Sequence, residues 1–261
     1  MSLMRWRVLA ALALLSGVFT LDANAGITFT GSSGNLSASA TFEVVGNNLQ
    51  ITLTNTSTFE TNVPADVLTA IFFDIAGNPT LGNGVGASVV LAGGANVING
   101  SQPAGGIVGG EFAFQQDSGG LGGGLTQHYG VSSVGLNLFG PGDLFPGDNL
   151  AGPDSPDGLQ YGLVSQGAIV PQGNNNPIAT DPLIQSSVVI TLTGAGSNFN
   201  LNSISNIRFQ YGTALNEPSF PPRDQLLEAP APPALVLALT GLACFGGLGF
   251  RRRLRALAAP V

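Results

Sequence analysis

Cysteine, lysine, histidine and tryptophan are almost absent from this chain of 261 residues. The single cysteine, Cys244, lies in an apolar stretch close to the C-terminus. The rest of the chain therefore contains no disulfide, no cysteine-based metal site and no thiol nucleophile. Its fold must be held together by burial of apolar side chains and by backbone hydrogen bonds.

Positive charge is equally scarce. All 8 basic residues are arginines, and only Arg208 and Arg223 lie between residues 26 and 228. The same range carries 14 acidic residues, which gives it a net charge of about −12. Nucleic acids and anionic lipid headgroups are bound by clustered Lys and Arg, so this composition excludes nucleic-acid binding.

The sequence also lacks a recognisable catalytic motif. His128 is the only histidine, which argues against a zinc site with histidine ligands, and no G-x-S-x-G motif occurs. We expect His128 to be a loop or strand-end residue. Carboxylates for a glycosidase pair are available, but sequence shows neither their separation nor a raised pKa. These candidates are Glu43, Glu60, Asp66, Asp74 and Glu111. We therefore expect no enzymatic activity, and keep a secreted hydrolase only as an alternative.

Residues 1–25 have the three parts of a secretory signal peptide. Two arginines give a basic start, an apolar run follows, and Ala23, Asn24 and Ala25 form an A-x-A cleavage site. The pattern predicts removal of this segment and a mature chain that begins at Gly26. The protein is then exported from the cytoplasm.

The C-terminal stretch begins with a proline-rich lead-in and continues as an uncharged apolar run over residues 234–250, followed by arginines. A run of this length is at the short end of what spans a bilayer. Basic residues beside such a run normally stay in the cytoplasm. The pattern predicts a transmembrane segment over 234–250 and a basic cytoplasmic tail over 251–261.

The order of these parts resembles the PEP-CTERM sorting signal of bacterial surface proteins. That signal consists of a Pro-Glu-Pro-like motif, a glycine-rich transmembrane segment and an arginine cluster. The matching residues here are Glu228, Pro230, Arg251, Arg252 and Arg253. The motif is a variant, because Leu227 rather than proline precedes Glu228. In that family an exosortase, a membrane cysteine peptidase, processes the tail during export. The resemblance implies the same partner here and cleavage near residues 228–233. A plain membrane anchor without cleavage is the alternative.

Between the terminal segments, apolar and polar side chains alternate over residues 36–44 and again over 49–54, after a Gly/Asn turn. This alternation predicts an antiparallel hairpin with one solvent-facing side. Further short runs rich in β-forming residues predict strands at 68–75, 87–91, 111–115, 129–139 with breaks, 159–164, 186–193 and 204–211.

No helical period of useful length occurs between the signal peptide and the C-terminal segment. We therefore predict an all-β fold, with a single antiparallel β-sandwich or jelly-roll-like domain over residues 26–215. A proline-rich stalk and sorting motif follow over 216–233. A C-terminal transmembrane helix completes the chain.

An acidic, Gly/Pro-rich stretch over residues 141–158 is the candidate metal site. Calcium is bound by six to eight oxygens, and acidic loops on β-domains can supply several of them. The candidate ligands are Asp143, Asp148, Asp154 and Asp157. Their spacing matches neither the EF-hand nor the nonapeptide calcium repeat, so solvated turns that use Asp are the alternative.

Carbohydrate binding is a further candidate, because β-sandwiches bind sugars with exposed aromatic rings and amide side chains. The only tryptophan, Trp6, lies in the signal peptide, so stacking must rely on Tyr129, Tyr161, Tyr211 or an exposed Phe. Polar Asn, Gln and Thr loops suit weak, multivalent contacts with a polysaccharide. We expect the three N-x-S/T sequons at Asn35, Asn55 and Asn99 to be chance matches.

A looser resemblance to the β-rich, low-charge surface proteins that precede exosortase signals extends into the exported part. It is carried by SASATFEVVGNNLQITLTNTS, AIFFDIAG and SPDGLQYGLVS. Together these features lead us to expect a surface or matrix protein of a Gram-negative bacterium, structural or adhesive, and associated with exopolysaccharide or biofilm. Its precursor is expected in the inner membrane and its product at the cell surface. A calcium- or carbohydrate-binding module is the alternative.

Overall fold

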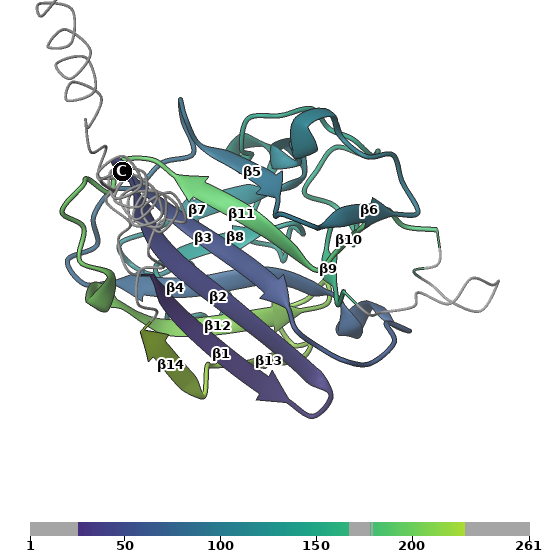
Figure 1. The fold of residues 1–261 in the computed structure, drawn as a ribbon, viewed down its shortest axis with the longest axis horizontal. Coiled ribbons are helices and arrows are strands. Elements are labelled where there is room, and N and C mark those ends of the chain that lie inside the picture. The colour runs from purple at the N-terminus through teal and green to yellow at the C-terminus, as the bar shows by residue number, and fades with distance from the viewer. Residues whose placement is uncertain (1–25, 167–177, 179, 228–261) are drawn as a thin grey trace, which may run out of the picture. The chain divides into compact units, whose positions relative to one another are not determined.

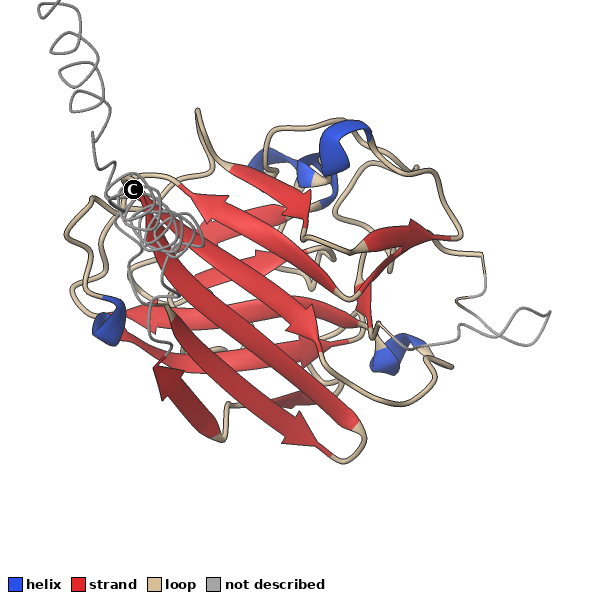
Figure 2. Ribbon diagram, viewed as in Figure 1, coloured by secondary structure: helices blue, strands red, loops and turns tan. Residues whose placement is uncertain are grey.

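The computed structural model describes residues 26–166, 178 and 180–227. These residues form two facing β-sheets with loops and short 3-10 helices, and no α-helix occurs among them (Figure 1, Figure 2). The prediction of an all-β sandwich is confirmed for this part of the chain. Within the same ranges, no helix is long and apolar enough to cross a membrane. The predicted signal peptide and transmembrane segment lie outside the described residues.

Six antiparallel strands form the first sheet, in the order β14, β1, β2, β3, β11, β5. This sheet is turned toward the viewer in Figure 1. Its strands are β14 (Asp224–Leu227), β1 (Ile27–Ser33), β2 (Leu36–Val45), β3 (Asn48–Asn55), β11 (Ser187–Leu192) and β5 (Ser88–Leu91).

The second sheet runs in the order β13, β12, β4, β9, β10, β6, with β8 pairing both β4 and β7 beside this path. Only β9 and β10 pair in parallel among the described strands. The strands are β13 (Ser219–Phe220), β12 (Ile204–Tyr211), β4 (Leu68–Ile75), β9 (Leu163–Val164), β10 (Leu183–Gln185), β6 (Asn96–Ile98), β8 (Tyr129–Ser132) and β7 (Ala113–Gln116). The 3-10 helices are η1 (Pro64–Asp66), η2 (Ala104–Gly106), η3 (Gly109–Glu111), η4 (Pro141–Asp143) and η5 (Leu201–Ser203).

The predicted hairpin is formed by β2 and β3. Val45 pairs with Asn48, so Gly46 and Asn47 make a two-residue turn. Gly46 has a φ of +62°, which a residue without a Cβ adopts at little cost. Along both strands buried apolar side chains alternate with partly exposed polar ones. The hairpin with one solvent-facing side is confirmed.

Aromatic rings connect the two sheets through the core. Phe42 of β2 contacts Phe29 of β1 and, across the core, Phe73 of β4, with ring centroids 5.8 and 5.4 Å apart. Phe73 in turn stacks on Tyr129 of β8 at 5.3 Å. All four rings are at least nine-tenths buried. Such contacts contribute beyond area burial alone and fix how the two sheets pack.

Loops cover the outer side of the second sheet around β4. Phe72 points away from the inter-sheet core and stacks on Phe139, with ring centroids 6.3 Å apart. Phe72 and Phe139 belong to a second apolar cluster, separate from the core between the sheets, which also contains the buried side chains of Leu121, Leu125 and Val134. Apolar side chains therefore cover the middle of β4 on both faces, which explains its uninterrupted apolar run from Ala70 to Phe73.

Three predicted strands are shorter in the structure. The strand predicted with breaks over 129–139 ends at Ser132, and further along Leu136 and Asn137 have φ values of +49° and +59°. The one predicted over 159–164 keeps only β9, since Tyr161 also has a positive φ, of +58°. In the third case, residues 109–111 form η3 before β7 begins. Backbone in the left-handed region or in a 3-10 turn cannot continue a sheet ladder.

The sandwich extends into the range for which the sequence predicts a stalk. Phe220 of β13 pairs with Phe209, and the backbone of β14 pairs with β1 from Thr30 to Ile27. Residues up to Leu227 therefore belong to the sheets. The domain boundary lies after this point and not at residue 215.

Candidate ligand-binding site

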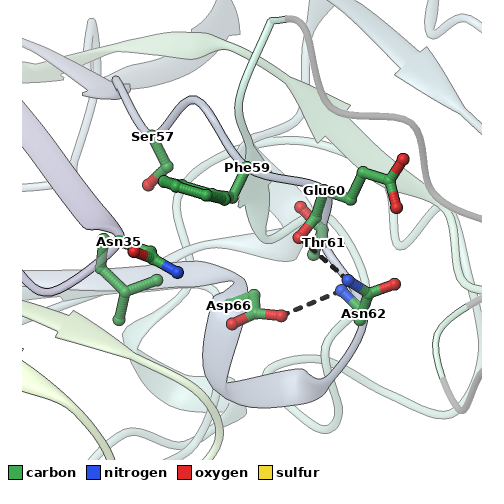
Figure 3. A pocket seen from close by; sticks show the side chains of 8 residues that line it. Asn35, Ser57, Phe59, Glu60, Thr61, Asn62 and Asp66 are labelled. Carbon is green, nitrogen blue, oxygen red and sulfur yellow. Dashed lines mark hydrogen bonds between the residues drawn. The ribbon is translucent and has the colours of Figure 1, made fainter.

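A pocket of about 300 Å³ lies at one end of the sandwich (Figure 3). Its walls come from the turn between β1 and β2, the loop after β3, and η1. The lining residues are Asn35, Leu36, Ser57, Phe59, Glu60, Thr61, Asn62 and Asp66. The pocket is therefore lined by residues with amide, hydroxyl and carboxylate groups and by one aromatic residue.

Buried polar side chains hold the loop after β3 in place. The amide of Asn55 donates to the carbonyl of Leu163 in the opposite sheet at 2.9 Å, and its oxygen accepts from the Ser57 amide at 3.0 Å. Tyr211 of β12 donates its hydroxyl to the Ser37 carbonyl at 2.8 Å. These bonds join both sheets next to Ser57, a pocket residue, and hold the start of the loop after β3.

Burial raises the pKa of Tyr211, and the nearby Asp66 carboxylate raises it further. The phenol therefore stays protonated and keeps donating to the Ser37 carbonyl across the ordinary pH range. That bond, which connects β12 to β2, therefore persists over this range.

Asp66 is fixed by the short helix that it ends. Its Oδ2 accepts hydrogen bonds from the backbone amides of Asn62 and Val63 at 2.9 and 3.1 Å. Pro64 fixes the backbone at the first position of η1. No described residue donates a hydrogen bond to Oδ1 of Asp66, so this oxygen can accept one from a ligand.

Phe59 supplies the aromatic wall. Its side chain is 54% exposed, and it is the only exposed aromatic residue of the described chain. The Phe59 ring, the Asn35 amide and the Asp66 carboxylate surround the same space, whereas the Glu60 carboxylate points away from it (Figure 3). An exposed ring beside fixed donors and acceptors can stack on a sugar while its hydroxyls are hydrogen-bonded.

The three tyrosines that the sequence offered for stacking are not available for it. Tyr129, Tyr161 and Tyr211 are all at least 98% buried. Tyr129 and Tyr211 pack in the core between the sheets. The remaining alternative from the sequence, an exposed phenylalanine, is met by Phe59. The sequence alone does not distinguish Phe59 from the phenylalanines of the core.

The four aspartates proposed as calcium ligands differ in their local surroundings. Asp143 accepts from Gln115 and from the Gly140 amide, so it serves η4. Asp157 accepts from the amide of Gly158, while Asp148 and Asp154 are exposed. Among the described residues, no group of three or more His, Cys, Asp or Glu side chains could hold a metal ion. Calcium binding by these four residues stays a prediction.

Glu111 explains how the same acidic stretch is anchored. Its carboxylate is 99% buried and accepts from the Leu150 amide, from the Ala151 amide at 3.0 Å and from the Ser155 hydroxyl at 2.6 Å. Three donors satisfy a charge that would otherwise be costly to bury. Glu111 therefore holds the loop 149–155 against the sandwich.

His128 and Asp74 form the closest acid–base pair, with Nδ1 2.7 Å from Oδ1. Asp74 also accepts from the His128 amide and from the side chain of Asn206. No hydroxyl or thiol nucleophile of the described chain is hydrogen-bonded to the ring. His128 lies directly before β8, the strand-end position that the sequence predicts.

The remaining sequence candidates have ordinary surroundings. Glu43 lies on the partly exposed side of β2. The amide of Asn55 is committed to the opposite sheet, so this sequon cannot carry a glycan without breaking that bond. Gly26 begins the described chain, and Ala23, Ala25, Glu228, Pro230, Arg251, Arg252 and Arg253 lie outside it.

Comparison with protein families, with curated proteins and with solved structures finds no match for this chain. The function must therefore be argued from the residues and the geometry alone. The pocket around Phe59 is the strongest starting point, because it joins an exposed ring to polar groups with unused hydrogen-bonding capacity.

Proposed function

We propose that the protein is an exported adhesive or structural component of the cell surface, which binds a neutral polysaccharide through the pocket around Phe59. The observation that carries this proposal is the exposed Phe59 ring beside Asn35 and Asp66. A neutral glycan fits because the exported part has a net charge of about −12, which repels acidic sugars.

The terminal segments complete the proposal. The signal peptide would export the chain, the segment 234–250 would hold the precursor in the inner membrane, and an exosortase would cleave near residues 228–233. The support for these steps is the order of sequence features, above all the arginine cluster that begins at Arg251. Cell-surface polysaccharide would then be the natural ligand.

Binding to an array of neutral gluco-, galacto- and manno-oligosaccharides tests the proposal. Full-length protein is used in a detergent without a sugar headgroup, and Phe59→Ala is compared with Phe59→Trp. Loss of the ring should weaken binding about tenfold, which corresponds to about 1.4 kcal/mol, whereas tryptophan should retain it.

Val85→Ala serves as the matched control, since it removes an exposed apolar side chain that does not line the pocket. It should bind as the unchanged protein does. If no oligosaccharide binds, or if Phe59→Ala binds as well as Val85→Ala, the proposed function is wrong.

A further inference from the structure

The outer face of the first sheet is covered with hydroxyl groups. Buried side chains of β1, β2, β3 and β11 point inward, so their intervening residues point away from the core. We call the outward Ser and Thr side chains of these four strands the hydroxyl face. They are Thr28, Thr30, Ser32, Ser37, Ser39, Thr41, Thr52, Thr54, Ser187 and Thr191.

Strand register arranges these hydroxyls in rows across the sheet. One row contains Thr30, Ser39, Thr54 and Ser187, which pair in succession through four strands. The next row contains Thr28, Thr41 and Thr52. Neighbours are about 4.8 Å apart across the strands and about 6.7 Å apart along them, as strand geometry requires.

These side chains are already ordered before any ligand arrives. Thr has a restricted χ1 angle, and the Thr28 and Thr41 hydroxyls lie 2.7 Å apart in a hydrogen bond. Short, stiff side chains lose little entropy when they bind. The hydroxyl face therefore presents fixed donors and acceptors at low entropic cost.

The hydroxyl face is nearly free of charge on a strongly acidic domain. Among the outward residues of β2 and β3, only Glu43 is ionisable. The exported part as a whole carries 14 acidic residues. A cationic or anionic partner gains nothing from this face, whereas a neutral, polyhydroxylated chain matches it in charge and in hydrogen-bonding groups.

The hydroxyl face is continuous with the pocket. Ser37 donates its amide to the hydroxyl of Ser57, a pocket residue, at 3.0 Å. The hydroxyl of Thr56, which is exposed at the rim, donates to the Ser37 hydroxyl at 3.0 Å. Hydroxyls therefore lead from the pocket wall over the rim and onto β2.

The two sheets differ in what covers them. Loops bury the outer side of β4 in the second sheet under Phe139 and its neighbours. In the first sheet, Ser39, Thr41, Thr52 and Thr54 all remain partly exposed. Thr28, Ser187 and Thr191 of the same face are buried, so the hydroxyls accessible beside the pocket are those at the centre of the face, on β2 and β3.

We infer that the hydroxyl face is a track for an extended neutral glycan, whose one end occupies the pocket around Phe59. This inference rests on the proposed function and adds that several sugar units bind at once. Each hydroxyl contact is weak, with about 0.5–1.5 kcal/mol net, so the gain comes from many contacts along one chain.

Dependence of affinity on glycan length tests the track. The full-length protein is titrated with a disaccharide and a hexasaccharide of whichever neutral sugar binds in the array. The hexasaccharide should bind about tenfold more tightly, because several further hydrogen bonds form on the face.

The variant Ser39→Ala/Thr52→Val/Thr54→Val removes three hydroxyls, and the two valines keep the β-branched shape of the threonines that they replace. It should bind the disaccharide as before, and its preference for the hexasaccharide should fall to about twofold or less. Thr80→Val, an exposed threonine outside the sheets, is the control and should keep the preference.

The outcomes separate the two proposals. If Phe59→Ala abolishes binding but both glycan lengths bind equally, the track is wrong and the pocket stands. The same holds if the triple variant, shown by circular dichroism to be folded, keeps the length preference. If neither glycan binds, the proposed function and the track both fail.

Discussion

At the scale of single residues, Glu111 combines deep burial with three donors, which makes it the best test of how the acidic loop is held. Glu111→Ala leaves the backbone amides of Leu150 and Ala151 without their acceptor, while the Ser155 hydroxyl keeps only the side-chain oxygen of Asn149. We expect the free energy of unfolding to fall by about 2–4 kcal/mol, since each orphaned buried donor costs about 1–3 kcal/mol.

Urea denaturation of the exported domain measures this loss, with Glu60→Ala as the matched control. The carboxylate of Glu60 is exposed, so its removal should change the free energy of unfolding by less than about 0.5 kcal/mol. Equal midpoints for the two variants would show that Glu111 does not anchor the loop.

The pocket residues show where sequence reasoning ends at this scale. Asp66 and Glu60 were visible as carboxylates and Asn35 as a sequon, but nothing in the sequence places them together. Phe59 follows a polar run, and its exposure depends on the hydrogen bonds that Asn55 and Tyr211 make across the sandwich. Such contacts join residues more than 100 positions apart, which local patterns do not contain.

At the scale of elements, alternation of apolar and polar residues predicts a strand well where the strand is long and one of its faces is exposed to solvent. The hairpin of β2 and β3 is the example, and β4 and β12 match their predicted bounds. The missed strand β1 contains Gly31, whose Cβ, if present, would lie 2.8 Å from the carbonyl of Pro221. Close approach of a distant segment requires glycine there, and glycine weakens the strand signal.

The last strand, β14, provides the test at this scale. A chain from Gly26 to Arg223 lacks β14 and leaves β1 at the sheet edge, whereas a chain from Gly26 to Leu227 keeps the four paired positions. The free energy of unfolding of the shorter chain should be lower by about 2 kcal/mol, and this chain should self-associate through the exposed edge of β1. Urea denaturation and size-exclusion chromatography measure these effects; identical behaviour of both chains would contradict the pairing.

At the scale of the whole molecule, the end of the sandwich and the expected cleavage region are adjacent. The last described strand ends at Leu227, and the proposed sorting motif begins at Glu228. Cleavage within 228–233 would therefore release the sandwich with every described strand intact. This arrangement suits a sorting signal, because a cut inside β14 would leave β1 as an unpaired edge strand that promotes aggregation.

The prediction is that the mature protein from its producing cells begins at Gly26 and ends between residues 228 and 233. Intact mass and C-terminal peptide analysis, with membrane and extracellular fractions measured separately, decide the matter. Replacing Arg251, Arg252 and Arg253 by Ala should impair orientation of the tail and leave unprocessed chain, because basic residues beside an apolar segment favour a cytoplasmic location. The matched change Arg223→Ala lies before the lead-in and should leave processing unchanged. An unmodified chain that ends at Val261 in the membrane fraction would show a simple anchor instead, while leaving glycan binding by the exported domain open to the tests above.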